Sequence, residues 1–166
     1  DALQKKYPKH KFIFNPEFLR ESSADEDMRN PSRQLVGYTN TSKDVAREIL
    51  KILPKAKYER IVMAKEAEMV KYFGNTFLAV KVIFATQMYE LCSAVGVDYE
   101  VVRECAQEDP RIGRSHLDVH AGGYLGYGGK CLPKDMDTLI QYASVSGIDL
   151  RLHRVVSELN NDITGK

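Results

Sequence analysis

The chain has 166 residues, of which 43% are hydrophobic and 28% charged, and its formal net charge is +1. These values are typical of one globular domain, or of one domain with part of another. A near-neutral charge without basic runs gives no indication of nucleic-acid binding. No uninterrupted apolar stretch approaches the roughly 20 residues that span a bilayer. Three cysteines at positions 92, 105 and 131 fit neither a disulfide framework nor a zinc cluster, so we expect a cytoplasmic protein.

The first sixty residues mix strand and helix patterns. Short apolar or alternating runs at 11–14, 33–38 and 60–64 predict strands. Helical spacing over 43–53, stopped by Pro54, predicts a helix before the last of these strands. This order is typical of α/β domains. Because G-x-G-x-x-G occurs nowhere in the chain, we expect a dinucleotide-binding domain to be incomplete here.

From about residue 65 the pattern is helical. A proline-free stretch from 65 to Gly96 predicts one helix of roughly 45 Å, closed by the glycine. The helix is apolar on more than one side, so we expect a second copy of the chain to pack against it. Three more helices are predicted, capped by Asp98, opening at Pro133 and beginning at Asp149, with a glycine-rich loop at 111–130.

The stretch GYGGKCLPKD places Cys131 between a glycine cluster and a helix start. Pro133 suits the first turn of that helix, whose macrodipole, with Lys130 and Lys134, would favour a reactive thiolate. The glycines let backbone N–H groups approach a ligand closely. The alternative is a small hydrophobic side chain before an ordinary helix. These residues by themselves favour neither interpretation.

Other polar residues allow two interpretations each. Asp135 could hold a water or act as a base, or could be an ordinary acidic first-turn residue. Lys71 and Asn75 share one face of the long helix and could stabilise an oxyanion, or could belong to a solvated stripe. His116 and His120 have no third ligand at a suitable spacing, so we expect no metal site.

The stretch NPEFLRES contains two carboxylates four residues apart. If Pro16 opens a helical turn with Asn15 as its N-cap, Glu17 and Glu21 lie on one face. An acidic first turn also arises for stability alone. Arg111, in DPRIG, is either an anion ligand or a solvated charge.

Four stretches, in this order, resemble motifs of the UDP-glucose/GDP-mannose dehydrogenase family: NPEFLRES, AEMVKYFGNTFLAVK, DPRIG and GYGGKCLPKD. The resemblance covers nearly the whole chain. It implies an α/β segment at 1–63 that ends a Rossmann-type NAD-binding domain. An all-α central dimerisation domain with one long helix follows at 64–166, and a C-terminal nucleotide-binding domain is expected outside this chain.

The resemblance also implies an activity. A nucleotide-sugar 6-hydroxyl would be oxidised to a carboxylate with two NAD⁺ consumed in succession, and UDP-glucose is the expected substrate. GDP-mannose and a UDP-N-acetylhexosamine are alternatives. A further alternative is that this chain acts only as a dimerisation module. The expected partners are the nucleotide sugar and a second copy of the chain, without nucleic acid or membrane.

By the same resemblance, Cys131 would attack the aldehyde to form a thiohemiacetal, which is then oxidised to a thioester and hydrolysed. Lys71 would stabilise the oxyanion with help from Asn75. Asp135 would position the water or act as base, and Glu21 would serve as acid/base or hold that water.

Binding roles are implied as well. Arg111 would reach the substrate across the dimer, and Lys134 and Glu21 would lie near the cofactor. The implied substrate contacts are Glu17, Phe18, Leu19, Arg20, Glu21, Lys71, Asn75, Arg111, Tyr124 and Gly128.

Overall fold

The computed structural model describes residues 2–165, apart from the side chain of Glu21. The chain divides between Phe73 and Gly74 into two compact units. This division lies inside a helix. The domain boundary expected at 63/64 stays a prediction about the whole protein.

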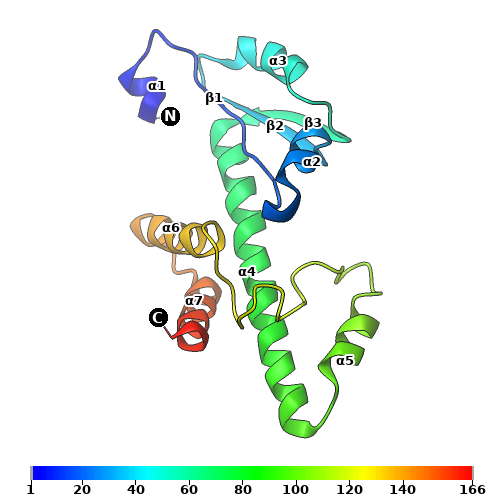
Figure 1. Ribbon diagram of the computed structural model, residues 1–166. Coiled ribbons are helices and arrows are strands. Elements are labelled where there is room, and N and C mark those ends of the chain that lie inside the picture. The colour runs from blue at the N-terminus through cyan, green and yellow to red at the C-terminus, as the bar shows by residue number, and fades with distance from the viewer. Residues whose placement is uncertain (1, 166) are drawn as a thin grey trace. The chain divides into compact units, whose positions relative to one another are not determined.

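The first unit is built on a three-stranded sheet in the order β1-β2-β3 (Figure 1). Strand β2 (Arg33–Tyr38) pairs antiparallel with β1 (Ile13–Phe14) and parallel with β3 (Tyr58–Met63). Helix α3 (Lys43–Ile52) connects β2 to β3 and packs against both. A parallel pair needs such a crossover, and its helix covers the sheet. The predicted strand–helix–strand order is therefore confirmed.

Short helices in this unit had no signal in the sequence pattern. They are α1 (Ala2–Lys6) and α2 (Ala24–Arg29), the latter preceded by the 3₁₀ turn η1 (Glu21–Ser23). Each is too short to show an amphipathic period, because a helix of about two turns offers only one or two core-facing positions.

The helical turn expected at Pro16 is wrong. Residues 15–20 form neither helix nor strand. The Asn15 side chain does not cap a helix; it donates to the carbonyl of Leu35 at 2.7 Å and to the Gln34 side chain at 3.2 Å. The Asn15 side chain instead holds this segment against β2. Because no helical turn forms at residues 15–20, Glu17 does not lie on a helix face.

Helix α4 (Ala64–Val95) is the single long helix predicted from the sequence. It follows β3 directly and ends at Gly96, whose φ of 73° is the left-handed C-cap conformation that glycine adopts without strain. By length and composition α4 could cross a membrane, although only 28% of its most apolar window is buried. Core helices of soluble proteins meet the same criterion. The expected absence of a membrane partner stays a prediction.

The second unit adds three helices and a long loop to α4. The helices are α5 (Tyr99–Ala106), α6 (Leu132–Val145) and α7 (Arg151–Thr164), and α6 and α7 pack side by side (Figure 1). Asp98 caps α5 as predicted, accepting the Glu100 N–H at 2.9 Å. The fold class, an α/β segment followed by helices with one long helix, is confirmed.

The loop between α5 and α6 is irregular but well anchored. The Tyr99 hydroxyl donates to the Leu117 carbonyl at 2.9 Å, and Leu117 joins the core formed with α4. Near the other end, the backbone N–H of Tyr127 donates to the Asn160 side chain of α7 at 2.7 Å. Asn160 is only 3% exposed, so its amide oxygen is the partner of a buried backbone group.

Replacing Asn160 with alanine is expected to lower the free energy of unfolding of the chain by about 1–3 kcal/mol, because the Tyr127 N–H loses its acceptor in a buried site. Chemical denaturation followed by circular dichroism measures the change. Asn161→Ala is the matched control, because Asn161 is the exposed neighbour on the same helix. Equal effects of the two replacements would show that the Tyr127 bond contributes nothing.

Candidate functional site

Cys131 occupies the N-cap position of α6, and its thiol side chain makes no capping bond. The residue is exposed, as is Cys105, whereas Cys92 is buried. Pro133 lies in the first turn of α6, as predicted. The Cys131 thiol is therefore open to solvent at the start of a helix and is not a buried packing residue.

Asp135 lies one turn further along α6 and is 2% exposed. Its carboxylate accepts from the Asn75 side-chain amide at 2.5 Å and from the Lys134 ammonium at 2.6 Å. A buried carboxylate is tolerated when it is paired and hydrogen-bonded in this way. The structure therefore joins Asn75 of α4 to Asp135, two residues whose spacing in the sequence gave no reason to connect them.

In the first unit, the Lys71 ammonium forms an ion pair with Glu17. Both side chains are partly exposed, at 25% and 48% respectively. Lys71 and Asn75 are one turn apart on α4, but Lys71 belongs to the first unit and Asn75 to the second. The predicted site residues are therefore divided between the two units, and the side chain of Glu21 lies outside the part of the chain that the structure describes.

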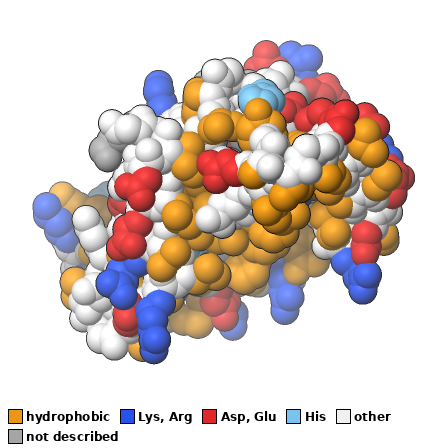
Figure 2. Space-filling view, turned by 90° about the horizontal axis from the view of Figure 1, so that it is seen from below, with side chains coloured by type: hydrophobic (Ala, Val, Ile, Leu, Met, Phe, Trp, Pro, Cys, Tyr) orange, Lys and Arg blue, Asp and Glu red, His pale blue; other side chains and the backbone are white. Residues whose placement is uncertain are grey.

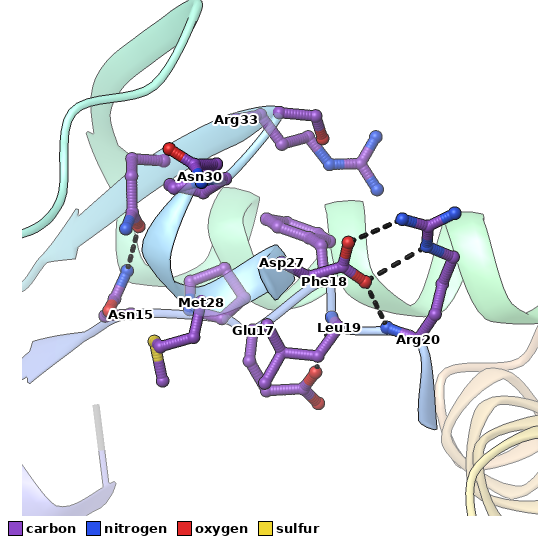
Figure 3. A pocket seen from close by; sticks show the side chains of 13 residues that line it. Asn15, Glu17, Phe18, Leu19, Arg20, Asp27, Met28, Asn30 and Arg33 are labelled. Atoms are coloured by element: carbon purple, nitrogen blue, oxygen red, sulfur yellow. Dashed lines mark hydrogen bonds and ion pairs between the residues drawn. The ribbon is translucent and has the colours of Figure 1, made fainter. Parts of the chain in front are cut away.

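The segment of residues 15–20 lines a pocket of about 340 Å³, together with α2 and the start of β2 (Figure 3). The Phe18 ring lies under the Arg33 guanidinium, 3.9 Å from its carbon to the ring centroid. The Leu19 N–H donates to the Glu17 carboxylate at 3.1 Å. Arg20 forms an ion pair with Asp27 at 2.6 Å. Aromatic, amide and charged groups thus meet around one irregular stretch of backbone.

The loop before α6 brings two more predicted residues together. Tyr124 covers Gly128, where an added Cβ would meet the tyrosine hydroxyl at 2.1 Å. A larger residue at position 128 would displace the tyrosine side chain. Arg111 is not joined to that pair; its exposed guanidinium binds Asp109 of its own loop at 2.5 Å, and the pKa of Asp109 is lowered by the Arg111 hydrogen bonds.

No set of three or more His, Cys, Asp or Glu side chains could hold a metal ion within the part of the chain that the structure describes. The absence of a metal site at His116 and His120, expected from their spacing, stays a prediction.

Sequence reasoning missed Asp27, Arg33 and Asn160. Asn160 had a usable signal, since it lies four residues after Val156 on the buried face of α7, where a polar residue needs a partner. Asp27 and Arg33 had none, because their contacts depend on how an irregular segment folds back.

Comparison with known proteins agrees with these observations. Residues 65–162 match the model of the UDP-glucose/GDP-mannose dehydrogenase family, central domain. The chain is 40% identical over 148 residues to the UDP-glucose 6-dehydrogenase of Pseudomonas aeruginosa. The aligned region covers 88% of this chain and 32% of that protein.

Solved structures show the same likeness. A UDP-glucose dehydrogenase from Pyrobaculum islandicum superposes with a TM-score of 0.79 at 35% identity, over 92% of this chain and 34% of that one. A GDP-mannose dehydrogenase from Pseudomonas aeruginosa matches with a TM-score of 0.52 at 30% identity, again over 92% and 34%.

The small sheet, the long helix and the shorter helices around it are thus shared with nucleotide-sugar dehydrogenases. The chain belongs to the UDP-glucose/GDP-mannose dehydrogenase family. It spans about a third of the length of the curated relatives it matches.

Proposed function

We propose that the whole protein carrying this chain is an NAD-dependent dehydrogenase that oxidises UDP-glucose to UDP-glucuronate in two steps. The observation that carries the proposal is the exposed Cys131 at the start of α6, one turn from the buried Asp135. The 40% identity to a UDP-glucose 6-dehydrogenase supports the choice of substrate. A cytoplasmic location remains a prediction.

In the proposed reaction, the Cys131 sulfur attacks the carbonyl carbon of the sugar aldehyde and forms a thiohemiacetal. Removal of a hydride and a proton converts this adduct to a thioester. Water then attacks the thioester carbon, and the thiol leaves with a proton as the carboxylate forms. Covalent attachment divides one difficult oxidation into two easier steps and keeps the aldehyde from escaping.

Three side chains serve this chemistry in the proposal. Asp135 accepts a proton from the attacking water. Asn75 orients Asp135 through one amide hydrogen, and its second amide hydrogen is available to an oxyanion. The Lys71 ammonium stabilises the same developing charge. Glu21 assists as acid/base or holds the water.

The nicotinamide cofactor accepts the hydride when it is bound. This chain has no G-x-G-x-x-G, so we expect the phosphate-binding turn of the dinucleotide site in another part of the whole protein. Lys134 and Glu21 are the residues proposed to face the cofactor from this chain. Arg111, Tyr124, Gly128 and the segment of residues 17–21 are proposed to bind the nucleotide sugar.

The test is the rate of NADH formation by the whole protein with UDP-glucose, GDP-mannose and UDP-N-acetylglucosamine in parallel. The proposal expects the highest kcat/KM with UDP-glucose and two NADH per sugar. A preference for GDP-mannose would favour the same chemistry on another sugar, an alternative that the 30% identity to a GDP-mannose dehydrogenase keeps open. One NADH per sugar would contradict the two-step oxidation.

A second function, dimerisation through α4, is favoured by an exposed apolar stripe. Phe84, Leu91 and Val95 are 61%, 54% and 62% exposed, and their spacings of seven and four residues put them on one side of the helix. Hydrophobic side chains also gather over a broad area of the face drawn in Figure 2. Exposed apolar patches of this kind mark interaction surfaces, and we propose a second copy of the chain as the partner.

Replacing Leu91 with aspartate is expected to weaken self-association of the chain by about a hundredfold, because the interface would have to bury an unpaired charge. Light scattering over a range of concentrations measures the effect. Val145→Asp on α6 is the control, because Val145 is 91% exposed and lies away from α4 in the sequence. A monomeric unmodified chain at high concentration would contradict the dimer.

A further inference from the structure

The carboxylate of Asp27, on α2, accepts four hydrogen bonds from Arg20 and Ser23, and Figure 3 draws the three that come from Arg20. It accepts from the backbone N–H of Arg20 at 2.8 Å, from Arg20 Nε at 3.0 Å and from Arg20 Nη2 at 2.6 Å. The Ser23 hydroxyl donates to it at 3.1 Å. Its side chain is 16% exposed, whereas that of Arg20 is 73% exposed. The carboxylate therefore faces the donors of Arg20 and Ser23 and is largely shielded from water.

The backbone bond is the important one of the four. An ion pair with an exposed arginine side chain contributes little by itself, because water solvates and screens both charges. A carboxylate that accepts a backbone N–H fixes the direction of the chain at that residue, and such charge-assisted bonds are strong. The hydrogen bonds from Arg20 also hold the pKa of Asp27 far below its usual value. Asp27 is therefore a charged carboxylate at neutral pH and accepts these hydrogen bonds in that form.

The segment of residues 15–20, which ends at Arg20, is held at two further places. The Asn15 side chain donates to the Leu35 carbonyl, and the Phe18 ring is covered by the Arg33 guanidinium. Residues 15–20 belong to no helix or strand. Contacts of this kind, rather than a helical or sheet ladder, therefore determine where their backbone groups point.

We propose that Asp27 is a positioning residue that holds the backbone of Phe18–Arg20 in the conformation that binds the nucleotide sugar. The inference rests on the proposed function, in which this segment contacts the substrate. Asp27 itself touches no reacting atom in the proposal; it acts through Arg20. The expected consequence of losing it is weaker substrate binding with little change in the chemical step.

The variant Asp27→Asn in the whole protein tests this inference. Asparagine has the same shape, but its NH₂ group would face donors of Arg20. We expect the KM for UDP-glucose to rise about tenfold, because one charge-assisted hydrogen bond is lost. The kcat should stay within about twofold of that of the unmodified protein. Hydrogen–deuterium exchange of the Arg20 amide should become faster in the same variant. Asp27→Glu keeps the negative charge, so its KM and its exchange rate at Arg20 should be close to those of the unmodified protein.

Asp25→Asn is the matched control, because Asp25 is an exposed aspartate on the same helix. It should leave KM and exchange unchanged. Unchanged exchange at Arg20 in Asp27→Asn, or faster exchange without a rise in KM, would overturn the inference. A fall in kcat alone would overturn it too.

Failure of the proposed function would be seen elsewhere. It would appear in the unmodified protein, as no NADH from any nucleotide sugar. In that case, calorimetry would compare UDP-glucose binding by the unmodified protein and by Asp27→Asn. Together with hydrogen exchange at the Arg20 amide, it would still test whether Asp27 positions the segment. Weaker binding with faster exchange would support it, and equal binding would overturn it.

Discussion

Replacing Cys131 with serine is expected to lower NADH formation from UDP-glucose by about a thousandfold or more in the whole protein. A serine hydroxyl at the start of α6 gains the same helix dipole, but it does not ionise near neutral pH and is a far weaker nucleophile than a thiolate. The covalent adduct that the second oxidation requires would then form too slowly. Steady-state absorbance of NADH measures the loss.

Cys105→Ser is the matched control for this experiment, because Cys105 is also exposed. It lies on α5, away from the start of α6 in the sequence, and should retain the activity of the unmodified protein. Mass spectrometry of Cys131 after incubation with the sugar aldehyde offers a second measurement, since the adduct should form only on this thiol. Undiminished NADH production by Cys131→Ser would remove the nucleophile from the proposed mechanism.

Replacing Asp135 with asparagine is expected to lower kcat by about a hundredfold or more, because an amide cannot take a proton from the attacking water. The new NH₂ group would also face the donors of Asn75 and Lys134, which now share this carboxylate. Thermal melting has to be measured alongside, since burying a group with mismatched donors lowers stability.

Two further variants separate catalysis from folding. Asp137→Asn removes an exposed carboxylate from the same helix and should change neither kcat nor melting temperature. The exchanged pair Asn75→Asp with Asp135→Asn keeps one carboxylate and one amide in contact and should recover stability without recovering kcat. A kcat within a few-fold of the unmodified value in Asp135→Asn would contradict its role as base.

Local sequence signals predicted the longer helices and strands well. Strand β2 has the predicted bounds, and α4 runs as one helix to Gly96, because a period of two or of 3.6 residues is visible in the chain itself over such lengths. The prediction at Pro16 was wrong because its residues suit two outcomes. Asn15 can cap a helix or bond to a strand, and only the neighbouring β2 decides between them.

The sequence by itself determined that Cys131 stands at a helix start beside glycines, because both features lie within ten residues of the chain. Tertiary structure alone decided which groups meet: Asn75 finds Asp135 across 60 residues, and Tyr127 finds Asn160 across 33. The physical reason is that a buried polar group must be paired, and its partner is set by how helices pack rather than by spacing along the chain.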